Sequence, residues 1–276
     1  MRDRRLDEAP PEAAPPSSSS PDAATRGLRR EATLRSAFDL AVATDVGLVR
    51  VTNEDCVLTQ RFRRGDTAYI GLIVADGVGG EPRGREASRL AAAAAMERLV
   101  TGDWVRPHEA LADAASAANR SVRGLATGPW ERPASTLVIA LVQEDEGRLY
   151  VANVGDSRAY VIKASRADPV TVDHMTGVRL AVEEADNVRE VFRTVLTRAV
   201  GMEEGVQPDL FGPFSLRPGE AVLLCTDGLH RVLDDVTIGR VVADRPAAQV
   251  VALLVAAANA EGGRDNVAVA FARRHG

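Results

Sequence analysis

Hydrophobic and β-branched residues recur in short runs from about residue 37 onward, separated by polar turns. Runs of this length and composition are typical of strands packed against a core. The predicted strands are residues 37–43, 67–75, 135–142, 148–154, 158–162, 221–225 and 267–272. Segments with strong helix propensity, one of them containing a long alanine run, predict helices at residues 84–100, 107–125, 234–243 and 247–260.

The order of these elements narrows the fold class. Strands are followed by two helices, several strands, a second pair of helices and a final strand. A polar stretch at residues 178–195 interrupts the later strands, and we interpret it as helix-like. The order favours sheets that are covered by helices on both sides.

The first 36 residues differ in composition from the rest of the chain. They contain five prolines, a serine run at residues 17–20 and mixed charges. Such a segment cannot bury enough apolar surface to offset the entropy of ordering it. We predict a disordered tail at residues 1–36, with a short helix near residues 29–35, and one folded domain at residues 37–274. Binding of a partner by the tail is the alternative.

Composition and charge exclude several classes of protein. The 276 residues are 45% hydrophobic and carry a net charge of -5, whereas a nucleic-acid partner would require a concentrated basic face. No run approaches the roughly 18 apolar residues of a membrane span, and the N-terminus lacks the apolar core of a secretory signal. Cys56 and Cys225 lie far apart, without zinc-site spacing. We therefore expect a cytoplasmic protein with no nucleic-acid or membrane partner.

Three aspartates lie where predicted strands begin or end: Asp76, Asp227 and Asp265. Carboxylates at strand ends can converge from distant parts of the sequence on one rim. With no Cys or His cluster beside them, oxygen ligands of this kind select Mg²⁺ or Mn²⁺ over zinc. Each Asp-Gly pair alone is a common turn signal. The three positions together favour a metal site.

A second polar segment precedes these aspartates. In it, Arg50 stands four and five residues before Glu54 and Asp55. One loop can therefore offer a guanidinium, whose planar fork binds two phosphate oxygens, together with carboxylates for a metal. The alternative is an exposed loop with a local ion pair, which would contribute little to stability.

Seven short segments, spread over about residues 38 to 272, carry a family resemblance. They are Arg50 with Asn53-Glu54-Asp55, Val74-Ala75-Asp76-Gly77-Val78-Gly79-Gly80, Ala134-Ser135-Thr136, Asn153-Val154-Gly155-Asp156-Ser157-Arg158, Leu196-Thr197-Arg198-Ala199-Val200-Gly201, Leu224-Cys225-Thr226-Asp227-Gly228-Leu229 and Gly262-Gly263-Arg264-Asp265-Asn266. In this order they resemble the metal-dependent protein phosphatases of the 2C type, in their bacterial form. The ordered set is far more specific than any one segment.

The resemblance implies an α+β fold, an α-β-β-α sandwich of two antiparallel sheets flanked by helix pairs. It also implies a site for two Mn²⁺ or Mg²⁺ ions at one edge of the sheets. By position, Asp76 would bridge both ions, the Gly77 carbonyl would bind one, and Asp227 and Asp265 would complete the pair.

The resemblance assigns the remaining site residues as well. Glu54 and Asp55 would contact an ion directly or through water, and Arg50 would hold the substrate phosphate. Asp156 and Asn266 would support the site. The predicted catalytic residues are therefore Arg50, Asp76, Asp227 and Asp265, and the predicted metal ligands are Glu54, Asp55, Asp76, Gly77, Asp227 and Asp265.

The expected reaction is hydrolysis of phosphoserine and phosphothreonine in proteins. Two cations about 3.5 to 4 Å apart lower the pKa of a shared water and neutralise charge on the phosphoryl oxygens, so that hydroxide attacks in line. A non-catalytic phosphoprotein-binding module on the same fold is the alternative. The expected partners are a phosphorylated protein substrate and a Ser/Thr kinase or its targets, or a regulator of the anti-anti-sigma type, and the protein is expected to be a monomer.

Some positions depart from the family pattern. Arg231 stands four residues after Asp227, where many members carry another aspartate that binds a third metal, and Glu131 lies where that metal's other ligand would be. We expect the third site to be weak or absent. Residues 164–195 would form the flap near the active site and would influence the choice of substrate.

Overall fold

The computed structural model describes residues 36–78, 83–128, 130–184 and 187–276. The predicted tail, with its short helix near residues 29–35, lies outside these ranges except for Ser36. Within the described residues, no helix is long and apolar enough to cross a membrane.

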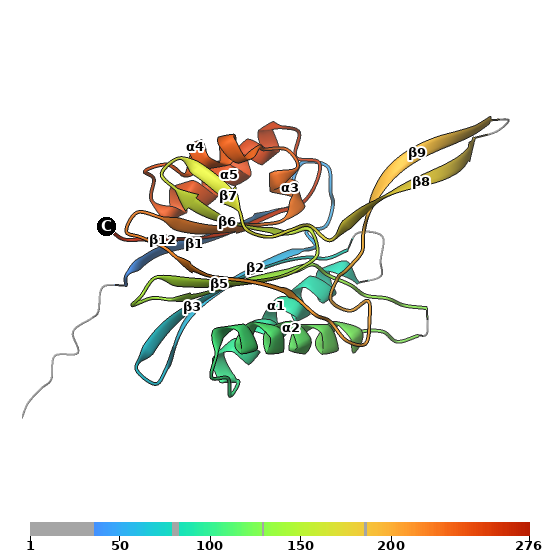
Figure 1. Cartoon of the computed structure of the whole chain (residues 1–276). Helices are drawn as coiled ribbons and strands as arrows, with labels where there is room; N and C mark the ends of the chain where they lie inside the picture. The colour runs from blue at the N-terminus through green and yellow to red at the C-terminus, as the bar shows by residue number, and fades with distance from the viewer. Residues whose placement is uncertain (1–35, 79–82, 129, 185–186) are drawn as a thin grey trace, which may run out of the picture. The chain divides into compact units, whose positions relative to one another are not determined.

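Two five-stranded antiparallel sheets form the centre of the domain (Figure 1). Sheet A has the order β1-β12-β11-β6-β7 and sheet B has the order β10-β5-β4-β3-β2. The strands of sheet A are β1 (Phe38–Asp45), β6 (Arg158–Lys163), β7 (Arg166–Pro169), β11 (Ala221–Cys225) and β12 (Val267–Arg274). The strands of sheet B are β2 (Asp55–Arg64), β3 (Thr67–Asp76), β4 (Leu137–Gln143), β5 (Arg148–Val154) and β10 (Asp209–Ser215).

Helices cover the outer face of each sheet. The helices α1 (Gly84–Thr101) and α2 (Pro107–Arg123) pack on sheet B, and α3 (Asp227–His230), α4 (Asp235–Val242) and α5 (Ala247–Ala260) pack on sheet A. The predicted α+β class and the α-β-β-α sandwich are therefore confirmed. All seven predicted strands and four predicted helices are present, with ends within two residues of those predicted.

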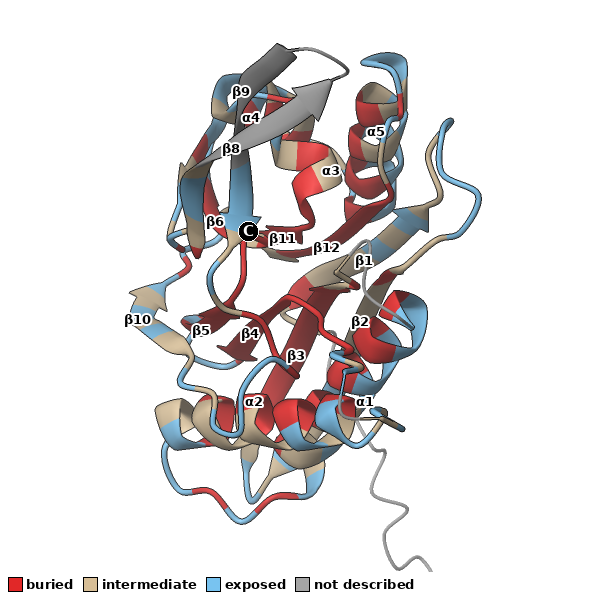
Figure 2. Cartoon of the chain, turned by 90° about the vertical axis from the view of Figure 1, so that its right-hand side faces the viewer, coloured by how far each residue is buried: buried red, intermediate tan, exposed pale blue. Residues whose placement is uncertain are grey.

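Alternating side chains place each central strand between two apolar layers. In β12, Ala268, Ala270 and Ala272 face the layer between the sheets, whereas Val269 and Phe271 face the helices. The strands β3, β4 and β11 alternate in the same way, which explains their nearly continuous apolar sequences. Figure 2 shows these inner strands as almost entirely buried.

One predicted element is wrong, and five strands were not predicted, two of which replace that element. Residues 178–195 do not form a helix: β8 (Met175–Glu184) and β9 (Asn187–Leu196) pair as an antiparallel hairpin that extends beyond the two sheets (Figure 1). The segment is polar, but it is rich in β-branched residues, which favour a strand over a helix. The other three unpredicted strands, β2, β7 and β10, are all at sheet edges.

Candidate active site

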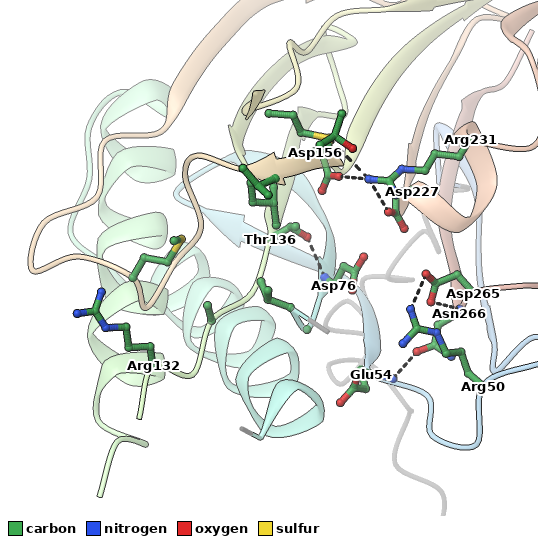
Figure 3. A pocket seen from close by; sticks show the side chains of 18 residues that line it. Arg50, Glu54, Asp76, Arg132, Thr136, Asp156, Asp227, Arg231, Asp265 and Asn266 are labelled. Carbon is green, nitrogen blue, oxygen red and sulfur yellow. Dashed lines mark hydrogen bonds and ion pairs between the residues drawn. The ribbon is translucent and has the colours of Figure 1, made fainter. Parts of the chain in front are cut away.

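The chain brings the three predicted aspartates to one pocket of about 480 Å³ (Figure 3). Asp76 is the last residue of β3, Asp227 is the first residue of α3 directly after β11, and Asp265 lies two residues before β12. Sheet B therefore supplies one carboxylate and sheet A supplies the other two. Arg50, Glu54 and Gly77, also predicted for the site, line the same pocket.

Hydrogen bonds from the start of β4 fix the backbone of Asp76. Its amide donates to the Thr136 hydroxyl (2.9 Å), and its carbonyl accepts from the Ser135 hydroxyl (2.9 Å) and the Thr136 amide (2.8 Å). Both hydroxyl side chains are buried. The backbone from which the Asp76 carboxylate projects is therefore rigid.

Asn266 holds the loop of Arg50 and Glu54 beside Asp265. Its side-chain carbonyl accepts from the Glu54 amide (2.8 Å), and its side-chain amide donates to the Val46 carbonyl (2.8 Å). The Arg50 guanidinium donates to the Asp265 carboxylate at 2.9 Å, and this contact raises the pKa of Arg50. The loop thus presents a guanidinium and a carboxylate to the same pocket.

Asp55 is placed differently from the other predicted ligands. It is buried opposite Asp76 in the β2–β3 pair and does not line the pocket. One carboxylate oxygen accepts from the Thr226 hydroxyl (2.8 Å), but Oδ1 has no hydrogen-bond partner among the described residues. Burial, with a smaller contribution from the Asp227 charge, raises the pKa of Asp55 to about 7.

The acidic groups at the pocket repel one another. Burial raises the pKa of Asp76 well above its usual value, and the charges of Asp55, Asp227 and Asp156 add to the effect. Burial also raises the pKa of Asp227, to about 6, although Arg231 opposes this shift. Clustered buried carboxylates are costly unless a cation compensates them, so the arrangement favours a bound positive charge.

Arg231 provides part of this compensation. Its guanidinium lies 3.0 Å from the Asp227 carboxylate and 2.9 Å from the buried Asp156 carboxylate. The family resemblance predicts a supporting role for Asp156, whereas at Arg231 it shows only a departure from the family pattern. Glu131 instead accepts hydrogen bonds from the Thr127 amide and hydroxyl, both at 2.9 Å, and does not line the pocket.

Two glycines permit the close approach of backbone segments around the site. A Cβ at Gly77 would lie 2.2 Å from the Gly84 carbonyl oxygen at the start of α1. A Cβ at Gly228 would lie 2.0 Å from the Asn266 carbonyl oxygen. Neither distance is possible for real atoms, so the Asp-Gly pairs at residues 76 and 227 have a packing reason beyond their tendency to form turns.

The donor set suits hard divalent cations. The candidates are carboxylate oxygens and one backbone carbonyl, which are ligands that Mg²⁺ and Mn²⁺ prefer. In the described ranges, no three Asp, Glu, His or Cys side chains are grouped tightly enough to surround one ion as they stand. Arginine pairs hold Asp227 and Asp265, and the orphaned Asp55 oxygen lies behind Asp76. The types of these residues and their positions therefore fit a metal centre. Arg50 and Arg231 would compete with the metal ions for the carboxylates of Asp265 and Asp227.

Comparison with known proteins places the chain in a family. A family model described as protein phosphatase 2C matches residues 51–270, a range that begins one residue after Arg50 and contains every other predicted site residue. The chain belongs to the protein phosphatase 2C family. It is similar to protein phosphatase PhpP of Streptococcus pneumoniae, with 31% identity over 246 residues that cover 85% of this chain and 96% of that protein.

Solved phosphatases of the same fold are also similar. MsPP, a PPM Ser-Thr phosphatase from Mycobacterium smegmatis in complex with cacodylate, is 29% identical with a TM-score of 0.68, covering 87% of this chain and 100% of that chain. The catalytic domain of the phosphatase PstP, in complex with 2 manganese ions, is 28% identical with a TM-score of 0.67, covering 87% and 99%.

In this protein phosphatase 2C domain, the pocket wall also includes residues that were not predicted as catalytic residues or metal ligands. Met175, Thr194, Val195 and Leu196 at the base of the β8–β9 hairpin line the pocket. The predicted flap at residues 164–195 thus corresponds to β7 and most of this hairpin. Arg132 and Met202 line it too, but no motif or charge pattern marks them.

Proposed function

We propose that the chain is a metal-dependent protein serine/threonine phosphatase, which hydrolyses phosphoserine and phosphothreonine at a site for two Mn²⁺ or Mg²⁺ ions. The observation that carries the proposal is the convergence of Asp76, Asp227 and Asp265, from three distant parts of the sequence, on one pocket beside Arg50. Family membership and the similarity to PhpP support the activity, and PstP, which was solved with 2 manganese ions, supports the cofactor.

The proposed metal ligands are those at the pocket rim. Asp76, the Gly77 carbonyl, Asp227 and Asp265 would hold the two ions, and Glu54 would complete the set. Asp55 is buried behind Asp76 and would act on the ions through its charge. A third ion would bind weakly or not at all, because Arg231 already places a positive charge between Asp156 and Asp227.

The bound ions would activate a water and neutralise charge on the phosphoryl oxygens. The chain itself would bind and orient the substrate. Arg50 would exchange its contact with Asp265 for two phosphoryl oxygens, because its planar guanidinium matches the spacing of such a pair. Arg231 would keep one oxygen of Asp227 turned toward itself and thereby orient the other. Asn266 would hold the Arg50 loop in position.

The proposed setting is the cytoplasm, where a monomer would act on phosphorylated proteins, among them a Ser/Thr kinase or its targets. Both cysteines are free in the structure, Cys225 buried and Cys56 half-buried, which agrees with a reducing compartment.

The test is a phosphatase assay on purified protein. With Mn²⁺ present, the chain should release phosphate from a phosphothreonine peptide, and Asp227→Ala should lower kcat at least about a hundredfold, because the ions that would neutralise the developing charge lose a ligand. Calorimetric titration with Mn²⁺ should show weaker binding by this variant. Asp103→Ala, which removes an exposed aspartate between α1 and α2, is the matched control. Full activity of Asp227→Ala would refute the site.

A further inference from the structure

The pocket has two chemically different ends. The residues proposed for catalysis form an acidic end around Asp76, Asp227 and Asp265. A second wall, which we call the distal wall, consists of Arg132, Thr194, Val195, Leu196 and Met202. It is apolar except for Thr194 and one arginine. At about 480 Å³, the pocket has room for more than one phosphate group, so the distal wall is available to other parts of a substrate.

Backbone contacts hold the distal wall together. Ser135 and Val200 exchange amide-to-carbonyl hydrogen bonds of 3.0 and 2.9 Å, which places residues 132–134 beside residues 201–203. A Cβ at Gly201 would lie 2.2 Å from the Pro133 carbonyl oxygen, so the two segments are in tight contact. Arg132 and Met202 therefore belong to one anchored part of the rim, although their side chains are exposed.

Arg132 lies on the other side of the pocket from Arg50. Figure 3 shows the two arginines on opposite sides of the pocket, with Asp76 between them. Arg50 is paired with Asp265 at 2.9 Å, whereas Arg132 forms no salt bridge with any residue in the described ranges. An exposed guanidinium that no carboxylate of the described residues neutralises attracts an anionic group.

The surface around Arg132 is unusually apolar. Val195 is 40% exposed and Met202 is 42% exposed, and both line the pocket. Trp130, two residues before Arg132, is 90% exposed. Exposed apolar side chains grouped around a cation mark an interaction surface, and the charge indicates a peptide that carries a negative side chain among neutral ones.

We propose that the distal wall is a substrate subsite, in which Arg132 binds an anionic side chain that lies within a few residues of the phosphoserine or phosphothreonine being hydrolysed. The anion is a carboxylate or a second phosphate. This inference rests on the proposed phosphatase activity and names the class of phosphoprotein that the same site prefers.

The experiment uses the full chain with Mn²⁺ and a set of phosphothreonine peptides. Each peptide is otherwise neutral and carries one glutamate, at one of three positions on either side of the phosphothreonine; a further peptide carries phosphoserine at the best position. Wild-type kcat/KM should rise about fivefold for glutamate at one or two neighbouring positions, and more for phosphoserine. Arg132→Ala should remove this preference, and Arg132→Glu should prefer lysine at the same position.

Two controls separate the subsite from the catalytic centre. The small substrate p-nitrophenyl phosphate has no side chain for the distal wall to bind, so Arg132→Ala should lower kcat/KM for the preferred glutamate peptide more than for this substrate. Arg166→Ala, which removes an exposed arginine on β7, should leave the peptide preference intact. A wild type with no preference among the peptides, or an Arg132→Ala variant that keeps it, would overturn the subsite. If the wild type hydrolyses neither peptides nor p-nitrophenyl phosphate, the proposed function itself fails, and the subsite with it.

Discussion

At the scale of single residues, the site concentrates negative charge that the fold does not fully neutralise. Asp55 and Asp227 are buried and Asp76 is half-buried; the charges of Asp55 and Asp227 raise the pKa of Asp76, and the charge of Asp227 raises that of Asp55. Arg231 and Arg50 neutralise Asp227 and Asp265 only in part, because both guanidinium groups are about half exposed. The folded state therefore binds protons more tightly than the unfolded chain does.

This excess of bound protons predicts how the stability of the metal-free protein depends on pH. The folded-state pKa values of Asp55 (about 7) and Asp227 (about 6) lie above the unfolded value of 3.8. Because the native state holds more protons between these limits, the free energy of unfolding should fall as pH rises from about 4 to about 7. Thermal melts in EDTA should give a higher Tm at pH 5 than at pH 7.5.

Two further melts test the cause. Asp55→Asn should flatten the pH dependence, since its side-chain carbonyl can still accept from Thr226 while the buried charge is gone. Mn²⁺ added at pH 7.5 should restore the Tm of the wild type, because bound cations replace the protons. A Tm that rises steadily from pH 5 to 7.5 without metal would contradict the assignment of these carboxyl groups.

Some of the residues that line the pocket could be predicted from the sequence, and others could not. Asp76, Asp227 and Asp265 could be predicted because each lies within two residues of the beginning or end of an apolar run, and Arg50 because it belongs to a recognisable segment. Arg132 and Met202 reach the pocket only through the pairing of Ser135 with Val200, which no local pattern encodes. The contact of Arg231 with both Asp156 and Asp227 likewise depends on the packing of α3.

At the scale of elements, His174 joins the base of the β8–β9 hairpin to the loop that carries Asp156. Its amide donates to the Gly155 carbonyl (3.0 Å), and its Nδ1 accepts from the Gly155 amide (3.0 Å). Its carbonyl accepts from the Thr197 amide (2.9 Å), and Nε2 donates to Asp209 on β10 (3.1 Å). The buried His174 side chain thus connects the base of the hairpin to β10 of sheet B.

Removing this side chain should loosen the hairpin base. His174→Ala leaves the Gly155 amide without its acceptor and opens a cavity, so we expect the free energy of unfolding to fall by about 2 to 4 kcal/mol. Because the hairpin base lines the pocket, KM for a phosphopeptide should rise more than KM for p-nitrophenyl phosphate. Urea denaturation and steady-state kinetics measure the two effects, with the exposed His275→Ala as control. Equal changes in both KM values would argue against a role for the hairpin in binding peptides.

Three of the strands that the sequence did not predict are edge strands. The edge strands β2, β7 and β10 have fewer fully buried positions than the inner strands, so their apolar signal is weak. Within the described residues, β8 and β9 pair only with each other. Their polar sequence resembles that of a helix on the protein surface. Inner strands such as β3 and β11, buried on both faces, were predicted nearly to the residue.

At the scale of the whole domain, the spacing between the two sheets sets the geometry of the pocket. Asp76 comes from sheet B, whereas Asp227 and Asp265 follow and precede strands of sheet A. The layer between the sheets contains several small side chains, among them Ala140, Ala159 and Ala270. A substitution in this layer should therefore change the geometry of the pocket, even when the substituted residue contacts none of the pocket residues.

A substitution in this layer tests the coupling. Ala270→Leu adds volume where no space is free, and overpacking of this kind should lower the free energy of unfolding by about 1 to 3 kcal/mol. Since the sheets would separate locally, Mn²⁺ affinity measured by calorimetry should also fall. Ala93→Leu, on the exposed face of α1, should change stability by no more than about 0.5 kcal/mol and leave the affinity unchanged. Unaltered Mn²⁺ binding by a destabilised Ala270→Leu would show that the pocket tolerates changes in sheet spacing.

The position of β12 has a consequence for how the molecule is made. This strand is the last of the sandwich to be translated, yet it lies between β1 and β11 in sheet A, and Asp265 and Asn266 immediately precede it. A nascent chain on the ribosome can complete sheet B and its helices while the centre of sheet A still lacks this strand. Until β12 is made, Asn266 cannot hold the Arg50 loop in place. In each new molecule the proposed active site is therefore complete only when synthesis of the domain is nearly finished.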